Sequence, residues 1–173
     1  MLGIDIVNLN DPLSQRKDDR ALQLIKHSKD ISIMHTELYW LLWAAKEAVF
    51  KCRREAVNFA PANIPVEIIN NDKDILFVSE ELNGLFQIEK EFIMAVCSDD
   101  LENTKFEIFK KKDRITSGSI RDDILAYFRL NNKIFEVGSD DLHLPVLLPP
   151  NEPISISHHL NLGALAYPKY LIE

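Results

Sequence analysis

The hydrophobic pattern between residues 37 and 54 predicts a long helix. Apolar side chains recur there every three or four positions, so they form one stripe when about 100° separates successive residues. The stripe consists of Leu38, Leu41, Leu42, Ala45, Val49 and Cys52. The opposite side carries Trp40, Trp43, Glu47 and Lys51. Two indoles beside a carboxylate and an ammonium group indicate a covered cleft, although an exposed ion pair between positions four apart is the alternative.

A second apolar segment, residues 2–9, has the β-branched run that is typical of a buried strand. Asp5 lies in the middle of this run. A carboxylate at such a position must be paired, hydrogen-bonded or bound to a metal, because its isolated desolvation costs several kcal/mol. We therefore treat Asp5 as a candidate functional residue.

Besides the long helix, the segments between residues 14 and 112 predict a second helix and several strands. Residues 16–27 are basic and have a helical pattern, whereas the apolar runs within residues 64–98 are short and strand-like. Asn83-Gly84 predicts a hairpin turn between two of these strands. Residues 105–112 are expected to form a further edge strand.

The last third of the chain predicts a helix followed by strands. Ser119, with Asp122 three positions later, predicts the N-cap of that helix. We expect a strand at residues 134–137, no regular structure at residues 146–153, and two strands within residues 154–167 with His158 at the bend. Together these segments predict an α+β fold.

Composition places the chain among globular proteins. It has 173 residues, of which 46% are apolar and 27% charged, enough for one domain or two small lobes that share an interface. No apolar run reaches the roughly 18 residues of a membrane span, and the first residues do not have the pattern of a leader, so we expect a cytoplasmic protein without membrane contact. Cys52 and Cys97 lie in apolar runs and are expected to be buried thiols. The five histidines lack ligand spacing, so a zinc site is not expected.

Charge is unevenly distributed along the chain. Nine basic and seven acidic side chains give residues 1–54 a net charge of +2, so the remainder carries −9 of the total of −7. This balance argues against general binding of nucleic acid, whereas the basic part could dock an acidic protein or a phosphate-rich small molecule. The candidate docking residues are Arg16, Lys17, Arg20 and Lys26. A solvated amphipathic helix is the alternative for the same stretch.

Three short segments together resemble the signatures of the 4′-phosphopantetheinyl transferases. They are GIDIV at residues 3–7, WAAKEAVFK at residues 43–51 and SISH at residues 155–158. The resemblance implies an enzyme that moves the phosphopantetheine arm of coenzyme A onto a serine of an acyl or peptidyl carrier protein. Such enzymes release adenosine 3′,5′-bisphosphate and serve fatty acid or polyketide biosynthesis.

The resemblance also implies roles for particular residues. Asp5 and Glu47 would hold Mg²⁺ on the pyrophosphate of coenzyme A, Lys51 would contact that phosphate, and Ser157 with His158 would grip the nucleotide phosphates. The residue types suit this chemistry, because Mg²⁺ prefers carboxylates together with water and substrate phosphate. Phosphoryl transfer is catalysed mostly by positioning and charge neutralisation. The proton acceptor for the serine is either Glu47 or a water on the metal.

The order of the signatures implies the architecture. Residues 1–100 resemble the second lobe of the two-lobed surfactin-type enzymes, and residues 113–173 resemble the first. We therefore expect a single transferase domain over residues 1–173, built from two pseudo-equivalent lobes of antiparallel sheet plus helix and active as a monomer. The alternative is the small holo-acyl-carrier-protein synthase type, which has the same order of signatures and assembles as a trimer.

The chain departs from the signatures at several positions. Val7 replaces a third acidic ligand of the two-lobed type, and His159 replaces the usual serine or threonine. His143-Leu144-Pro145 stands where Gly-Lys-Pro is usual before SISH. These changes leave a second reading open, in which the chain is a non-catalytic homologue that binds a carrier protein or coenzyme A.

Overall fold

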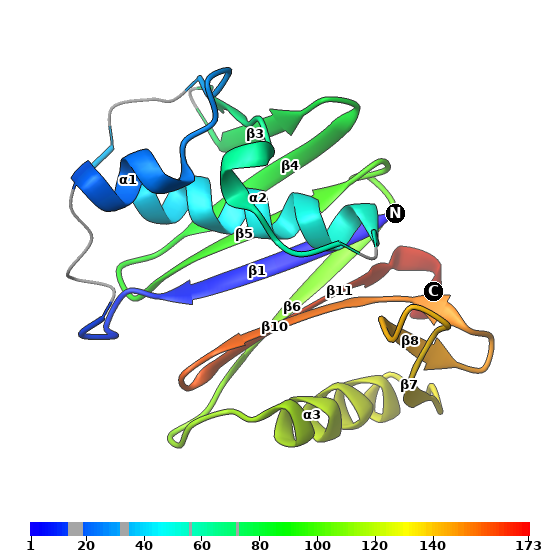
Figure 1. Ribbon diagram of the computed structural model, residues 1–173. Coiled ribbons are helices and arrows are strands. Elements are labelled where there is room, and N and C mark those ends of the chain that lie inside the picture. The colour runs from blue at the N-terminus through cyan, green and yellow to red at the C-terminus, as the bar shows by residue number, and fades with distance from the viewer. Residues whose placement is uncertain (14–18, 32–34, 56, 72) are drawn as a thin grey trace.

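The computed structural model describes residues 1–13, 19–31, 35–55, 57–71 and 73–173. Its helices pack on antiparallel sheets (Figure 1), which confirms the α+β class and is consistent with the fold that the resemblance implies. In these described parts, no helix is long and apolar enough to cross a membrane.

The first half of the chain builds a five-stranded antiparallel sheet in the order β1-β5-β4-β3-β2. Its strands are β1 (Leu2–Asn8), β2 (Glu67–Asn70), β3 (Ile75–Ser79), β4 (Leu82–Ile88) and β5 (Phe92–Ser98). The long helix α2 (Leu38–Arg53) lies across β1 and β5, and the short helix α1 (Asp19–Ile25) lies beside α2 (Figure 1). The 3-10 helix η2 (Pro61–Asn63) precedes β2.

A glycine allows α2 to lie directly on β1. A Cβ atom at Gly3 would come within 2.0 Å of the Ala48 carbonyl oxygen and within 2.6 Å of the Cys52 nitrogen. The backbones of helix and strand therefore touch at this point. The predicted apolar stripe of α2 is buried as expected, apart from a partly exposed Leu38.

One charged residue of α2 is buried, although the helical pattern did not indicate it. Lys46 has no exposed surface, and its Nζ lies 2.8 Å from an equally buried oxygen of Asp30. Lys46 also donates to the Ile64 carbonyl, and Asp30 accepts from the Val66 N–H. This pair fixes α2 against the two loops that pass over it.

The second half of the chain builds a three-stranded sheet in the order β10-β11-β6. Its strands are β6 (Thr104–Lys110), β10 (Ser155–His159) and β11 (Leu162–Pro168), with helix α3 (Ser117–Leu130) packed against them (Figure 1). A second sheet of three short strands holds β7 (Glu136–Ser139), β8 (Pro145–Leu148) and β9 (Glu152–Pro153), and the 3-10 helix η3 (Lys169–Leu171) follows β11.

The two larger sheets share an apolar cluster. It contains Leu2, Ile4, Ile6, Met94 and Val96 from the first sheet and Leu162, Ala164 and Ala166 from the second. The division into lobes 1–100 and 113–173 stays a prediction. Strand β6 falls between those two ranges and pairs with β11, so it belongs structurally with the second half.

Four local predictions differ from the structure. Asn83-Gly84 lies inside β4 and not at a turn, because Gly84 leaves the space that the Phe77 ring occupies. The turn falls at Glu80, which has a positive φ of 55°. Helix α3 begins after Thr116, whose hydroxyl forms a reciprocal capping box with Ser119.

The other two differences concern the approach to the SISH segment. Residues 146–153 were expected to be irregular but contain most of β8 and all of β9, joined by a turn with a cis bond between Pro149 and Pro150. His158 lies within β10, and the bend between the last two strands falls at Leu160 and Asn161.

Candidate active site

The edges of the two larger sheets meet where β1 lies beside β10. Alternate side chains of β10 accept hydrogen bonds from the backbone of β1. The N–H groups of Ile4, Ile6 and Asn8 donate to Ser155 Oγ, Ser157 Oγ and His159 Nδ1 over 3.0, 3.3 and 3.1 Å. Side chains thus replace the usual backbone ladder, and their two-residue spacing follows from the alternation of a strand.

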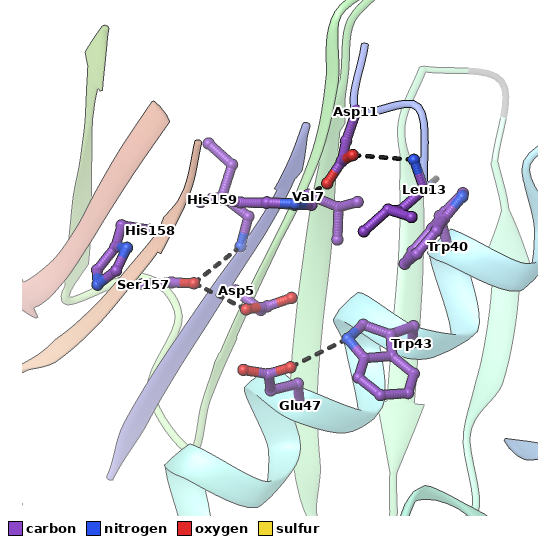
Figure 2. Close-up of a pocket in the computed structure, with 11 residues that line it drawn as sticks. Asp5, Val7, Asp11, Leu13, Trp40, Trp43, Glu47, Ser157, His158 and His159 are labelled. Carbon is purple, nitrogen blue, oxygen red and sulfur yellow. Dashed lines mark hydrogen bonds and ion pairs between the residues drawn. The ribbon is translucent and has the colours of Figure 1, made fainter. Parts of the chain in front are cut away.

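Asp5 lies at this junction. Its neighbours Ile4 and Ile6 face the second sheet, so strand alternation turns Asp5 toward α2. The side chain is almost fully buried, and its Oδ1 accepts hydrogen bonds from Ser157 Oγ at 2.8 Å and from Lys51 Nζ at 3.1 Å. Both halves of the chain therefore hold the same carboxylate, and Figure 2 shows the contact from Ser157.

Helix α2 contributes the charged side chains opposite Asp5. Glu47 and Lys51 are one turn apart, and Lys51 Nζ lies 3.0 Å from Glu47 Oε1 while it also donates to the Ile4 carbonyl. The indole N–H of Trp43, one turn earlier, donates to Glu47 Oε2 over 3.0 Å (Figure 2). The side chains of Glu47 and Lys51 are 25% and 24% exposed, which agrees with the covered cleft that the sequence indicated.

The close packing of these charges changes their protonation. Burial raises the pKa of Asp5 from 3.8 to about 6, with a further increase from Glu47, although the attraction of Lys51 opposes both. Burial acts in the same direction on Glu47, but Lys51 and the hydrogen bonds from Lys51, Asp5 and Trp43 outweigh it and lower the pKa. Burial would lower the pKa of Lys51, yet the two carboxylates raise it.

A cavity of about 330 Å³ opens beside this cluster. Its lining comprises Asp5, Ile6, Val7, Asp11, Leu13, Trp40, Trp43, Glu47, Ser157, His158 and His159 (Figure 2). His158 follows Ser157 on β10 and points away from Asp5, toward α3, where its Nε2 lies 3.3 Å from Ser117 Oγ. Burial and the positive charges of Lys51 and Arg114 lower the pKa of His158.

Comparison with protein-family models identifies the fold that carries this cluster. Residues 1–114 match the model of the 4′-phosphopantetheinyl transferase superfamily. The chain belongs to that superfamily. The matched part includes Asp5, Glu47 and Lys51, whereas Ser157 and His158 lie beyond it. A search of curated proteins and a search of solved structures found no match.

Superfamily membership makes the chain a transferase of phosphopantetheine type and raises the question of a metal site. Among the described residues, no group of three or more His, Cys, Asp or Glu side chains could hold a metal ion. Asp5 and Glu47 nevertheless form a carboxylate pair close enough to raise the pKa of Asp5, and Lys51 already brings one cation to both. This donor set fits Mg²⁺, which commonly takes one or two carboxylates and completes its shell with water and substrate phosphate.

Several contacts of this candidate site were not foreseen from the sequence. Trp43 and Glu47 are four positions apart on one helix, so their spacing contained the signal for the indole bond. The pairing of Asp11 with His159 had no comparable signal, since the two residues are 148 positions apart. The structure brings Asp5, Glu47, Lys51 and Ser157 into one cluster and places His158 on the cavity wall beside it.

Proposed function

We propose that this protein transfers the 4′-phosphopantetheine arm of coenzyme A to a serine of an acyl or peptidyl carrier protein and releases adenosine 3′,5′-bisphosphate. The observation that carries the proposal is that Asp5 and Glu47 line one cavity and are both paired with Lys51, within the part of the chain that matches the superfamily. Two carboxylates and an ammonium group at one point suit a diphosphate and its cation.

Each member of the cluster has a distinct task in this proposal. Asp5 and Glu47 would hold Mg²⁺, which neutralises the charge of the pyrophosphate when it is bound. Lys51 keeps its proton, because both carboxylates raise its pKa, and its ammonium group contacts a phosphate oxygen. Glu47 stays ionised at neutral pH, because its pKa is lowered, so the proton of the attacking serine would go either to its carboxylate or to a water on the metal.

Ser157 and His158 would serve the coenzyme in different ways. The Ser157 hydroxyl accepts the Ile6 N–H and donates to Asp5, so we assign it the task of orienting that carboxylate. The His158 side chain is exposed on the cavity wall, and the charges of Lys51 and Arg114 are close enough to lower its pKa. Positive charge in this region favours the phosphates of the nucleotide.

We propose that a single chain forms the whole site. Asp5 comes from residues 1–100 and Ser157 from residues 113–173, and their side chains are joined by a bond of 2.8 Å within one chain. This supports an active monomer of 19.9 kDa. Light scattering under assay conditions should show that mass, whereas an active species of about three times that mass would contradict the monomer and favour the trimeric alternative.

We further propose that the basic residues near α1 dock the acidic face of the carrier. Arg20 and Lys26 are exposed, whereas Arg16 and Lys17 lie outside the described residues. The double variant Arg20→Glu/Lys26→Glu should raise KM for the carrier and leave KM for coenzyme A unchanged. The exposed pair Arg121 and Arg129 on α3 gives a matched control. Equal effects of both charge reversals would refute a specific docking role.

The metal-centre assignment is tested with Glu47→Gln. This variant keeps the size of the side chain and its ability to accept from Trp43 but removes the charge. Transfer from coenzyme A to an apo carrier protein in the presence of Mg²⁺ should fall by about 10²-fold or more, with the circular dichroism spectrum unchanged. Near-full activity of this variant would show that the assigned centre is wrong. A folded parent protein that binds coenzyme A without transfer would instead support the non-catalytic homologue.

A further inference from the structure

A hydrogen-bonded pair lines one side of the cavity. The carboxylate of Asp11, just after β1, uses both of its oxygens. Oδ1 accepts the backbone N–H of Leu13 at 2.9 Å, and Oδ2 lies 2.8 Å from Nε2 of His159 at the end of β10 (Figure 2). Asp11, Leu13 and His159 all line the cavity that contains the Asp5 and Glu47 carboxylates.

The hydrogen bonds define the state of the imidazole. His159 Nδ1 accepts the Asn8 N–H at 3.1 Å, so this nitrogen carries no proton. The proton is therefore on Nε2, which donates to Asp11. The bond from the Leu13 N–H and then the bond from His159 lower the pKa of Asp11, so its carboxylate is ionised at neutral pH.

The second nitrogen distinguishes His159 from the two serines before it. Ser155 and Ser157 show that a hydroxyl is enough to accept an N–H from β1. A third serine at position 159 would serve the same backbone contact. The imidazole accepts that N–H and carries a donor on the far side of its ring, and this donor reaches the loop after β1.

We propose that Asp11 and His159 are a positioning pair that holds Leu13 against the cavity and thereby sets the affinity of the site for coenzyme A. The choice of coenzyme A as the ligand rests on the proposed function. The link from His159 through Asp11 to Leu13, which we call the latch, rests on the geometry alone. The hydrogen bonds described for Asp11 and His159 join them to Leu13, to Asn8 and to each other, and not to Asp5 or Glu47, so the pair acts on the shape of the cavity. Its loss changes binding of the coenzyme more than the rate of the chemical step.

Two variants of His159 separate the latch from the backbone contact. His159→Asn keeps an acceptor at the δ position for the Asn8 N–H but cannot reach Asp11. His159→Gln keeps a donor at the ε position for Asp11 but leaves the Asn8 N–H without its acceptor. We expect His159→Asn to weaken coenzyme A binding about tenfold or more, as loss of a hydrogen bond to a charged group would, and His159→Gln to change it by less than about threefold.

The measurements are calorimetric titration with coenzyme A and Mg²⁺, steady-state kinetics, and hydrogen exchange of the Leu13 amide by NMR. The amide should exchange at least about tenfold faster in His159→Asn and at the parent rate in His159→Gln. KM for coenzyme A should rise in His159→Asn while kcat changes by less than about twofold. Adding Leu13→Ala to His159→Asn should weaken binding no further, because both changes remove the same contact.

If His159→Gln weakened coenzyme A binding more than His159→Asn did, the proposal would be overturned, because only the bond to β1 would then matter. Unchanged exchange and affinity in His159→Asn would overturn it as well. If the parent protein does not bind coenzyme A, the proposed function fails, and the Leu13 amide still decides whether the latch exists. If the parent binds and the amide responds without any change in affinity, the latch exists but the assigned role is refuted.

Discussion

Asp5→Asn should stabilise the metal-free protein at neutral and alkaline pH. Burial raises the pKa of Asp5 from 3.8 to about 6. A carboxyl group with a raised folded-state pKa contributes stability that is fully present below its unfolded pKa and is lost as pH rises through the folded pKa. Two pKa units correspond to roughly 3 kcal/mol, which is the cost of ionising Asp5 in the fold. The amide avoids this cost, and its oxygen can still accept from Ser157 and Lys51.

Urea unfolding at pH 4 and pH 8, without divalent cations, measures this effect. The stability difference between Asp5→Asn and the parent should be small at pH 4 and approach roughly 3 kcal/mol in favour of the variant at pH 8. Glu81→Gln, at an exposed position, is a control for the loss of one negative charge. A variant less stable than the parent at pH 8, or a stability difference that does not change with pH, would refute the raised pKa of Asp5.

Mg²⁺ should stabilise the parent protein and leave the stability of Asp5→Asn unchanged. The cation offsets the repulsion between Asp5 and Glu47, so at a concentration of about 100 times its dissociation constant it should stabilise the parent by about 2.7 kcal/mol. Asp5→Asn should not respond, because only one carboxylate remains. An equal response of both proteins would place the metal elsewhere.

Three further predictions concern the supports of the site. Trp43→Phe removes the N–H that orients Glu47 and should lower kcat/KM about tenfold or more, measured against Phe59→Leu, which keeps that bond. Lys46→Met leaves its buried partner carboxylate unpaired and should cost about 3–5 kcal/mol in urea unfolding. Gly3→Ala forces α2 away from β1 and should destabilise the fold by about 1–3 kcal/mol. Gly118→Ala, which meets no atom closer than 3.9 Å, should be neutral or stabilising, and a similar loss in both would contradict the tight contact.

Periodicity explains how much of the site could be predicted. A carboxylate inside a buried strand and a carboxylate on the covered face of a helix are both visible as exceptions to a pattern, and Asp5 and Glu47 were found in this way. Their partner Lys51 followed from the four-residue spacing of a helix. The same reasoning failed for Lys46, because its burial depends on Asp30 in a distant loop.

Contacts between distant segments could not be read from the sequence. The bond from Ser157 to Asp5 spans 152 positions and depends on the meeting of two sheet edges. The prediction of a turn at Asn83-Gly84 was wrong for a related reason, since Gly84 is required by the ring of Phe77 on the neighbouring strand. Local chemistry thus predicted which residues are unusual, and tertiary packing decided what they contact.

The most direct test of the proposed activity is the intact mass of an apo carrier protein after incubation with this protein, coenzyme A and Mg²⁺. We predict that the carrier gains the mass of one phosphopantetheine group at its acceptor serine, with one adenosine 3′,5′-bisphosphate released per carrier modified. Glu47→Gln should modify the carrier at least about 10²-fold more slowly under the same conditions. An unmodified carrier with the folded parent protein, or equal modification by parent and variant, would contradict the account.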